Sequence, residues 1–151
     1  MNKRHIYIGA DSAGFVLKEH LKKRLTDEGY TVTDCGTDSE ASCHYPLFAH
    51  AVCEQVQNNL DHAFGILICG TGIGMSMCAN KHKGIRAALC GDTFSARMTR
   101  AHNDANVLCL GARVVGVCLA EDILSAFLSA DFEGGRHQTR VDMMMTLEGE
   151  N

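Results

Sequence analysis

The sequence predicts an α/β protein with a single doubly wound, Rossmann-like sheet of five parallel strands, helices on both faces and an extra C-terminal helix. Two observations predict this class. Short apolar runs alternate along the whole chain with longer segments in which apolar residues recur every three or four positions. In addition, the apolar run Phe64–Cys69 is followed at once by Gly70-Thr71-Gly72-Ile73-Gly74, an order typical of a buried strand, a tight loop and a helix start.

The strands are predicted at the short apolar runs. They are expected at His5–Ala10, Thr31–Cys35, Phe64–Cys69, Ile85–Cys90 and Asn106–Gly111. Between them, helical spacing of apolar residues covers 16–25, 47–56 and 117–127, and another helix begins near Thr93 and ends at His102. Because strands separated by helices need crossover connections, the sheet is expected to be parallel and covered on both faces.

The chain is expected to form one domain over residues 1–151, a usual size for a single core. Its last predicted element is a helix over about 136–148 that no strand follows. Val141, Met143, Met144, Met145 and Leu147 make this helix more apolar than a solvent-exposed tail requires. We therefore expect it to pack on a neighbouring subunit, in a homodimer or a dimer of dimers.

Composition and charge exclude several classes of function. The chain has 14 basic and 18 acidic side chains, a formal net charge of −4 and no basic run, so neither a nucleic-acid nor a membrane partner is expected. The N-terminal apolar stretch is too short for a signal peptide and no window approaches a membrane span, which predicts a cytoplasmic protein. The eight cysteines are then expected as free thiols, and without a Cys-x-x-Cys pair no structural zinc site is expected.

Cys69 and the glycines after it form the first candidate site. Backbone N–H groups in such a loop can bind an anion, and the helix N-terminus adds positive potential. Cys69 could be only a core thiol, but a helix N-terminus favours the thiolate, which suits a base or a nucleophile. The glycines also fit a dinucleotide site with Asp92 as the ribose-binding acid, although Met75 stands where close helix approach needs a glycine.

Two further candidates lie at the end of a predicted strand and of a predicted helix. Asp11 ends the first strand and could line the same crevice as Cys69, or it could serve only as a helix N-cap. His102 titrates in the range that acid–base catalysis needs. His102 and Asn103 also have a purely structural interpretation. A histidine such as His102 can compensate the dipole at a helix C-terminus, and an asparagine such as Asn103 can end the helix.

Three arginines could bind a phosphate group. Arg136 and Arg140 are four residues apart and share one helical face, where they could form a planar clamp or be merely solvated. Arg113 follows the fifth predicted strand and could join them around one crevice. Arginines collected in this way in an acidic protein indicate an anionic small molecule as the partner.

In their order along the chain, these segments resemble the ribose-5-phosphate isomerase B family, which also contains the galactose-6-phosphate isomerase subunits. The likeness covers nearly the whole chain. The matched segments are Asp11-x-x-Gly14, Tyr45-Pro46, Ile68-Cys-Gly-Thr-Gly-Ile-Gly74, Asn80-Lys81, Gly84-Ile-Arg86, His102-Asn103-x-x-Asn106-Val107, Gly111-x-Arg113 and Glu133-Gly-Gly-Arg-His-Gln-x-Arg140.

The resemblance implies an aldose–ketose isomerase that interconverts ribose 5-phosphate and ribulose 5-phosphate through an enediol, without a metal or an organic cofactor. Cys69 would move a proton between carbons 1 and 2, since Met75 stands where one branch of the family has a glutamate. His102, helped by Tyr45, would open the furanose ring, and the amides of the glycine loop would hold the enediolate oxygen. The implied catalytic residues are Cys69, His102, Thr71 and Tyr45; the implied substrate-binding residues are Asp11, Ser12, Gly70, Gly72, Ile73, Gly74, Asn103, Arg113, Arg136 and Arg140. The three arginines match phosphate ligands that a neighbouring subunit contributes in part.

Two positions depart from the family pattern. Ser12 replaces the usual histidine, and His44 stands where an aspartate is common. Both border the implied site and concern the choice of sugar, with allose 6-phosphate or another aldose phosphate as the alternative substrate. A sugar-phosphate-binding protein without turnover is the alternative from another class. It would need the arginines, but not Cys69 and His102 together.

Overall fold

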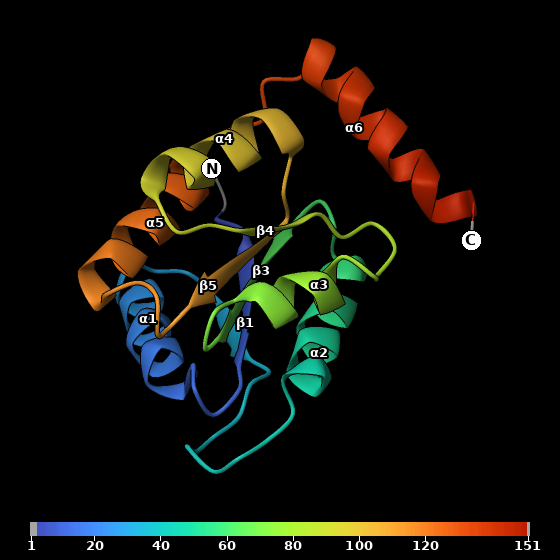
Figure 1. Ribbon diagram of the computed structural model, residues 1–151. Helices are drawn as coiled ribbons and strands as arrows, with labels where there is room; N and C mark the ends of the chain where they lie inside the picture. The colour runs from blue at the N-terminus through green and yellow to red at the C-terminus, as the bar shows by residue number, and fades with distance from the viewer. Residues whose placement is uncertain (1–2, 151) are drawn as a thin grey trace.

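A computed structural model describes residues 3–150 and contains five strands and six α-helices in this range (Figure 1). The elements are, in chain order, β1 (His5–Ala10), α1 (Phe15–Asp27), β2 (Val32–Asp34), α2 (Tyr45–Gln57), β3 (Ala63–Cys69), α3 (Ile73–Ala79), β4 (Ala87–Leu89), α4 (Thr93–Asn103), β5 (Val107–Gly111), α5 (Val117–Ser129), α6 (Arg136–Thr146) and a 3-10 turn, η1 (Leu147–Glu150). The predicted fold class is confirmed.

The sheet has the strand order β2-β1-β3-β5-β4, and every neighbouring pair is parallel. The chain leaves β1 toward one edge of the sheet and leaves β3 toward the other edge. The point where this direction reverses therefore lies between β1 and β3. In open α/β sheets, ligands bind outside the carboxyl ends of the strands at this point.

Two hydrophobic cores lie on the two faces of the sheet. Because side chains alternate along a strand, Ile66 and Ile68 face the core under α1, α4 and α5, whereas Leu67 and Cys69 face the core under α2 and α3. All seven residues of β3 are buried. Its nearly continuous apolar sequence follows from this burial on both faces.

The edge strands are shorter than predicted. β2 and β4 have three residues each, so Cys35 and Cys90 lie just beyond the strands in which they were expected. Each edge strand pairs with only one neighbouring strand. Hydrogen bonds therefore hold fewer of its residues in extended conformation than in a central strand. The final helix also ends earlier than expected, at Thr146, and continues as η1. Within the described residues, no helix has both the length and the apolar character needed to cross a membrane.

Helix α6 lies apart from the sheet, beside the C-terminal end of α4 (Figure 1). The arrowhead of β5 points away from α6, so this helix lies at the amino edge of the strands. The η1 turn that follows α6 is fixed to the loop before β4, because the backbone N–H of Gly84 donates to both carboxylate oxygens of Glu148 at 3.0 and 3.1 Å.

Candidate active site

Three loops meet at the carboxyl edge of the sheet, at the ends of β1, β3 and β5. The backbone N–H of Asp11 donates to the carbonyl of Ile68 at 3.2 Å. On the other side, the N–H of Ala112 donates to the carbonyl of Cys69 at 2.9 Å, and the N–H of Arg113 donates to the carbonyl of Gly70 at 2.9 Å. These bonds hold the loop after β3 between the other two, as the sequence predicts for Asp11 and Cys69.

Cys69 is the last residue of β3 and its side chain is almost buried, with 5% of its surface exposed. Its Sγ accepts a hydrogen bond from the backbone N–H of Gly72 at 3.2 Å. Gly72 has a φ of 79°, in the left-handed region that glycine adopts without strain, and this turn directs its N–H toward the sulfur. An amide donor binds a thiolate more strongly than a neutral thiol, because bonds to ionised groups are the stronger ones.

The loop also carries free backbone donors. Within residues 3–150, the N–H groups of Gly70 and Thr71 donate to no other backbone or side-chain atom, whereas the N–H of Ile73 donates to Thr71 Oγ1 at 3.3 Å. Unpaired amides beside a thiol are suited to binding an oxygen that becomes negative during a reaction. Thr71 and Ile73 also line an apolar hollow of about 290 Å³ at this edge.

Tyr45 and Arg113 flank the glycine loop. Tyr45 is the first residue of α2, and a Cβ added to Gly74 would lie only 2.6 Å from its ring. The Arg113 side chain lies over Gly70, where an added Cβ would be 3.6 Å from Nη1. Both side chains therefore lie beside the loop that holds Cys69, as the resemblance implies.

The structure assigns Asp11 and Asp92 to different local roles. Asp11 does not cap α1, whose N-cap is Gly14; its carboxylate Oδ1 instead accepts the N–H of Gly14 at 3.1 Å and closes the turn beside Cys69. Asp92 is the N-cap of α4, and its Oδ1 accepts the N–H of Ser95 at 2.7 Å. Because β5 separates β4 from β3, Asp92 lacks the position of a ribose-binding acid on the strand next to the glycine loop.

Ser12 lies in the loop after β1 at the carboxyl edge, whereas four other predicted site residues lie at the opposite edge of the sheet. His102 and Asn103 end α4 immediately before β5, and Arg136 and Arg140 lie in the first half of α6. Along the five residues of β5, the two edges are about 13 Å apart at 3.3 Å per residue. Within one chain, Arg113 therefore lies near Cys69 and the other two arginines do not, so a crevice lined by all three needs residues from a second subunit and stays a prediction.

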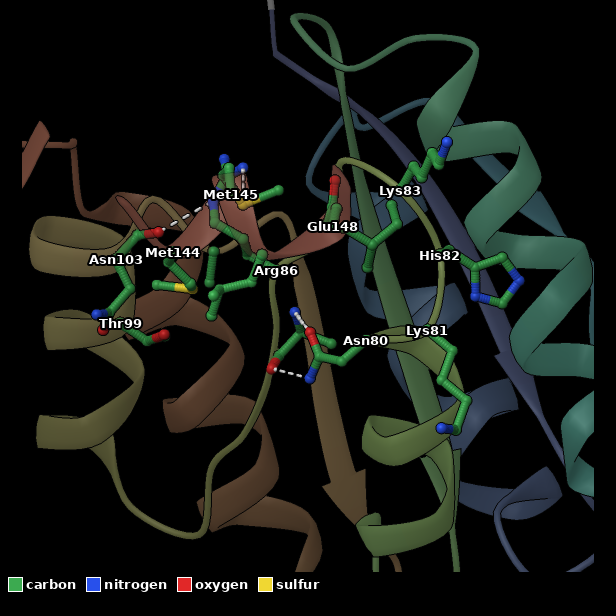
Figure 2. Close-up of a pocket in the computed structure, with 14 residues that line it drawn as sticks. Asn80, Lys81, His82, Lys83, Arg86, Thr99, Asn103, Met144, Met145 and Glu148 are labelled. Atoms are coloured by element: carbon green, nitrogen blue, oxygen red, sulfur yellow. Dashed lines mark hydrogen bonds between the residues drawn. The ribbon is translucent and has the colours of Figure 1, made fainter. Parts of the chain in front are cut away.

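A larger pocket, of about 920 Å³, also lies at the amino edge (Figure 2). Residues 80–87, the end of α4 and the C-terminal half of α6 line it. Asn103 is the predicted site residue found there, and the backbone carbonyl of Asn103 accepts a hydrogen bond from Arg86 Nε at 3.1 Å. Its lining does not include Cys69 or the glycine loop.

Sequence reasoning missed one cluster at this edge. The rings of His102 and His137 stack with centroids 4.1 Å apart, and Glu133 lies against both. The four-residue spacing of Glu133 and His137 is visible in the sequence. The approach of His102 is not, because it depends on how α6 packs on α4.

The eight cysteines, all within the described range, are free thiols as expected. Burial raises the pKa of Cys53 to about 12 and that of Cys90 to about 11, so both stay protonated and inert near neutral pH. Cys69 differs from these two in ending a central strand at the switch point and in receiving the Gly72 amide.

Comparison with known proteins identifies the family. Residues 6–144 match the model of the Ribose/Galactose Isomerase family. The chain belongs to this family. The resemblance drawn from the motifs is thereby confirmed, as is the expected enzyme class, a sugar-phosphate aldose–ketose isomerase.

Individual relatives in the family align over almost the full chain. Ribose-5-phosphate isomerase B of Escherichia coli is 46% identical over 145 residues, which cover 96% of this chain and 97% of the relative. D-erythrulose-4-phosphate isomerase of Pectobacterium atrosepticum is 46% identical over 138 residues, covering 91% and 90%. The crystal structure of ribose-5-phosphate isomerase B from Mycoplasma genitalium with bound ribulose-5-phosphate has a TM-score of 0.94 at 42% identity, covering 97% of each chain.

Proposed function

We propose that this protein interconverts ribose 5-phosphate and ribulose 5-phosphate through an enediol, with Cys69 as the base, in a site built by two subunits. The observation that carries the proposal is the Cys69 loop, in which a nearly buried thiol accepts the Gly72 amide and lies beside two unpaired N–H groups. The names of the Escherichia coli and Mycoplasma genitalium relatives support this choice of substrate.

The chemistry needs one base and one stabilised oxygen. The Cys69 thiolate takes the proton from carbon 2 of the open-chain aldose, and the electron pair moves through the C1–C2 bond onto the carbonyl oxygen. The N–H groups of Gly70 and Thr71 bind the resulting enediolate oxygen. The hydroxyl proton then passes from the oxygen on carbon 2 to the oxygen on carbon 1. Return of the proton from the Cys69 thiol to carbon 1 gives the ketose and regenerates the thiolate, so every proton is accounted for without another reactant.

Ring opening requires a group from the other edge of the sheet. Cys69 acts at carbons 1 and 2, and His102 would act at the ring oxygen, which is bonded to carbon 1. A general acid must approach its atom to about 2.6–3.2 Å, yet the core between the two edges separates His102 from Cys69 of the same chain. His102 and Cys69 therefore serve one substrate only when they come from different subunits.

Helix α6 has the features expected of an element that docks on that partner. Met143 of α6 is 66% exposed, Leu147 at the start of η1 is 59% exposed, and Met144 is also exposed. Apolar side chains of this size on a projecting helix are stabilised when a second subunit covers them. We propose a homodimer, or a dimer of dimers, in which the same contact brings Arg136 and Arg140 to the phosphate of a substrate whose reacting carbons lie at the partner's Cys69 loop.

A second candidate substrate has a specific observation in its favour. The relative that acts as a D-erythrulose-4-phosphate isomerase is as similar in sequence as the Escherichia coli relative, so a shorter sugar phosphate is a real alternative. Ser12, in the loop after β1, and His44, the N-cap of α2, are the departures from the family pattern. Allose 6-phosphate is the longer alternative.

A coupled assay across ribose 5-phosphate, erythrulose 4-phosphate and allose 6-phosphate tests the proposal. The highest kcat/KM is expected with ribose 5-phosphate, and Cys69→Ser is expected to lose nearly all turnover because a hydroxyl is a far weaker base than a thiolate. Binding without turnover of any of the three sugars would favour the sugar-phosphate-binding alternative. Near-normal turnover by Cys69→Ser would exclude Cys69 as the base.

A further inference from the structure

Three side chains from three segments converge at the junction of α4 and α6. His102 lies in the last turn of α4, Glu133 in the loop before α6, and His137 in the first turn of α6. The Nε2 atoms of the two histidines lie 3.7 and 3.6 Å from the same carboxylate oxygen, Glu133 Oε2. One ligand atom from each residue lies within 4.8 Å of the other two.

These separations are too long for hydrogen bonds and suit a shared ion. Only 7% of His137 is exposed to solvent. Its Nε2 atom is buried and has no hydrogen-bond partner within the described chain. Such an atom is costly to bury unless something pairs with it. Tetrahedral zinc bonds of about 2.0–2.2 Å would put its nitrogen and oxygen ligands roughly 3.3 Å apart, so Glu133 Oε2 is only a few tenths of an ångström too far from each Nε2. The two stacked rings would also turn so that both nitrogens face one ion.

The loop that carries Glu133 has a fixed position beside His102. The N–H of Glu133 donates to the carbonyl of Ala101 at 3.0 Å and ties the loop to α4. The backbone therefore holds the Glu133 carboxylate between the ends of α4 and α6, where both histidines can reach it.

We propose that His102, Glu133 and His137 form a binding site for a divalent transition-metal ion of the zinc type, and that the bound ion inhibits isomerisation by occupying Nε2 of His102. Two histidines and a carboxylate leave a fourth position for water, as in open zinc sites. The ion would be a reversible inhibitor rather than a cofactor. Metal binding stands on the cluster alone, whereas inhibition rests on the proposed function of His102.

Cobalt(II) in place of zinc distinguishes this cluster from the thiols, because cobalt bound to thiolate gives an intense sulfur-to-metal absorption that nitrogen and oxygen ligands do not give. The full chain, freed of metal, is titrated with Co²⁺ as wild type, Glu133→Gln and His137→Gln. We expect one tight site per chain without the thiolate absorption, and at least about tenfold weaker binding in each variant.

A second pair of stacked histidines supplies the matched control. His50 Nδ1 and His82 Nε2 lie 2.8 Å apart and hydrogen-bond to each other, so these rings already have partners. His82→Gln is therefore expected to leave the tight Co²⁺ site unchanged. Equal binding by wild type, Glu133→Gln and His137→Gln, or thiolate absorption from the tight site, would overturn the proposed metal site.

Inhibition is measured separately, with Zn²⁺ and each protein compared with its own metal-free activity. The Zn²⁺ concentration that halves the turnover of ribose 5-phosphate is expected to be at least about tenfold higher for Glu133→Gln than for wild type. Equal inhibition of both proteins would overturn the inhibitory role and point to Cys69 as the target. If no sugar phosphate is turned over, the proposed function fails, while the Co²⁺ titration still decides whether the metal site exists.

Discussion

Two inactive variants are expected to restore activity when they assemble together. Cys69→Ala removes the proposed base at the carboxyl edge of the sheet, and His102→Gln removes the proposed ring-opening group at the amino edge. These edges are about 13 Å apart along β5, with the core between them. If one substrate contacts both groups, each site takes Cys69 from one subunit and His102 from its partner.

The expected recovery follows from the twofold symmetry of a dimer. Random assembly of an equimolar mixture makes about half of the dimers mixed, and in each mixed dimer one site has both groups while the other has neither. About one quarter of all sites in the mixture are then intact, and one half of the sites in isolated mixed dimers, so the isolated mixed dimers should reach about half of wild-type turnover. A site made by a single chain would give no recovery, because every chain lacks one group.

The variants are co-expressed with different tags, and mixed dimers are isolated and verified by native mass spectrometry before the isomerase assay. A control pair, Cys69→Ala with Arg113→Ala, carries both changes at the carboxyl edge, where Arg113 lies over Gly70. Mixing this pair should add nothing to the residual activity of its parents. Verified mixed dimers of the first pair without recovered turnover would refute the shared site.

Three other predictions concern ring opening, phosphate binding and acid stability. His102→Ala should slow turnover of the cyclic aldose more than that of the open-chain ketose in the reverse direction, and equal losses would indicate a structural role instead. Arg140→Ala should raise KM for sugar phosphates about ten- to a hundredfold, the loss of one charge-assisted contact of roughly 1.5–3 kcal/mol, and an unchanged KM would remove Arg140 from the phosphate site. Burial raises the pKa of Asp34, but hydrogen bonds from Lys18, Lys22 and the Gly36 amide outweigh it and lower the pKa below 3.8. The stability that this carboxylate adds is therefore present above about pH 3.8 and is lost as the pH falls through the lowered pKa. In urea unfolding, Asp34→Asn should be about 1–3 kcal/mol less stable than wild type at pH 7. Its free energy of unfolding should also fall less steeply than that of wild type as the pH is lowered.

The order of elements could be predicted from the sequence because each central strand has a local signature. β3 is apolar throughout and ends at glycines, and β1 and β5 are likewise short apolar runs bounded by polar segments. The predicted edge strands are too long, since partly or fully buried residues such as Cys35 and Cys90 lie beside a strand end without belonging to the strand. The position of β5 between β3 and β4 has no local signature, because it depends on contacts between residues far apart in the chain.

The part of the candidate site at the carboxyl edge could also be predicted from local sequence signatures. Asp11, Cys69 and Arg113 each follow a strand, and parallel strands bring such residues to one edge. His102 ends a helix that immediately precedes β5, and this order already assigns it to the other edge. The contact of His102 with Glu133 and His137 had no signal, since nothing local in the sequence sets the angle at which α6 leaves the loop.

In the proposed enzyme, the separation of the two half-sites would make activity depend on assembly. A twofold axis that brings the amino edge of one subunit to the carboxyl edge of its partner creates two complete sites at once, because an isologous contact is made twice. The exposed apolar side chains of α6, Met143 and Leu147 among them, would lie near these sites in such a dimer. Burying them stabilises the dimer and also brings Arg136 and Arg140 to the substrate, so substitutions that weaken the interface should reduce turnover even where they touch no reacting atom.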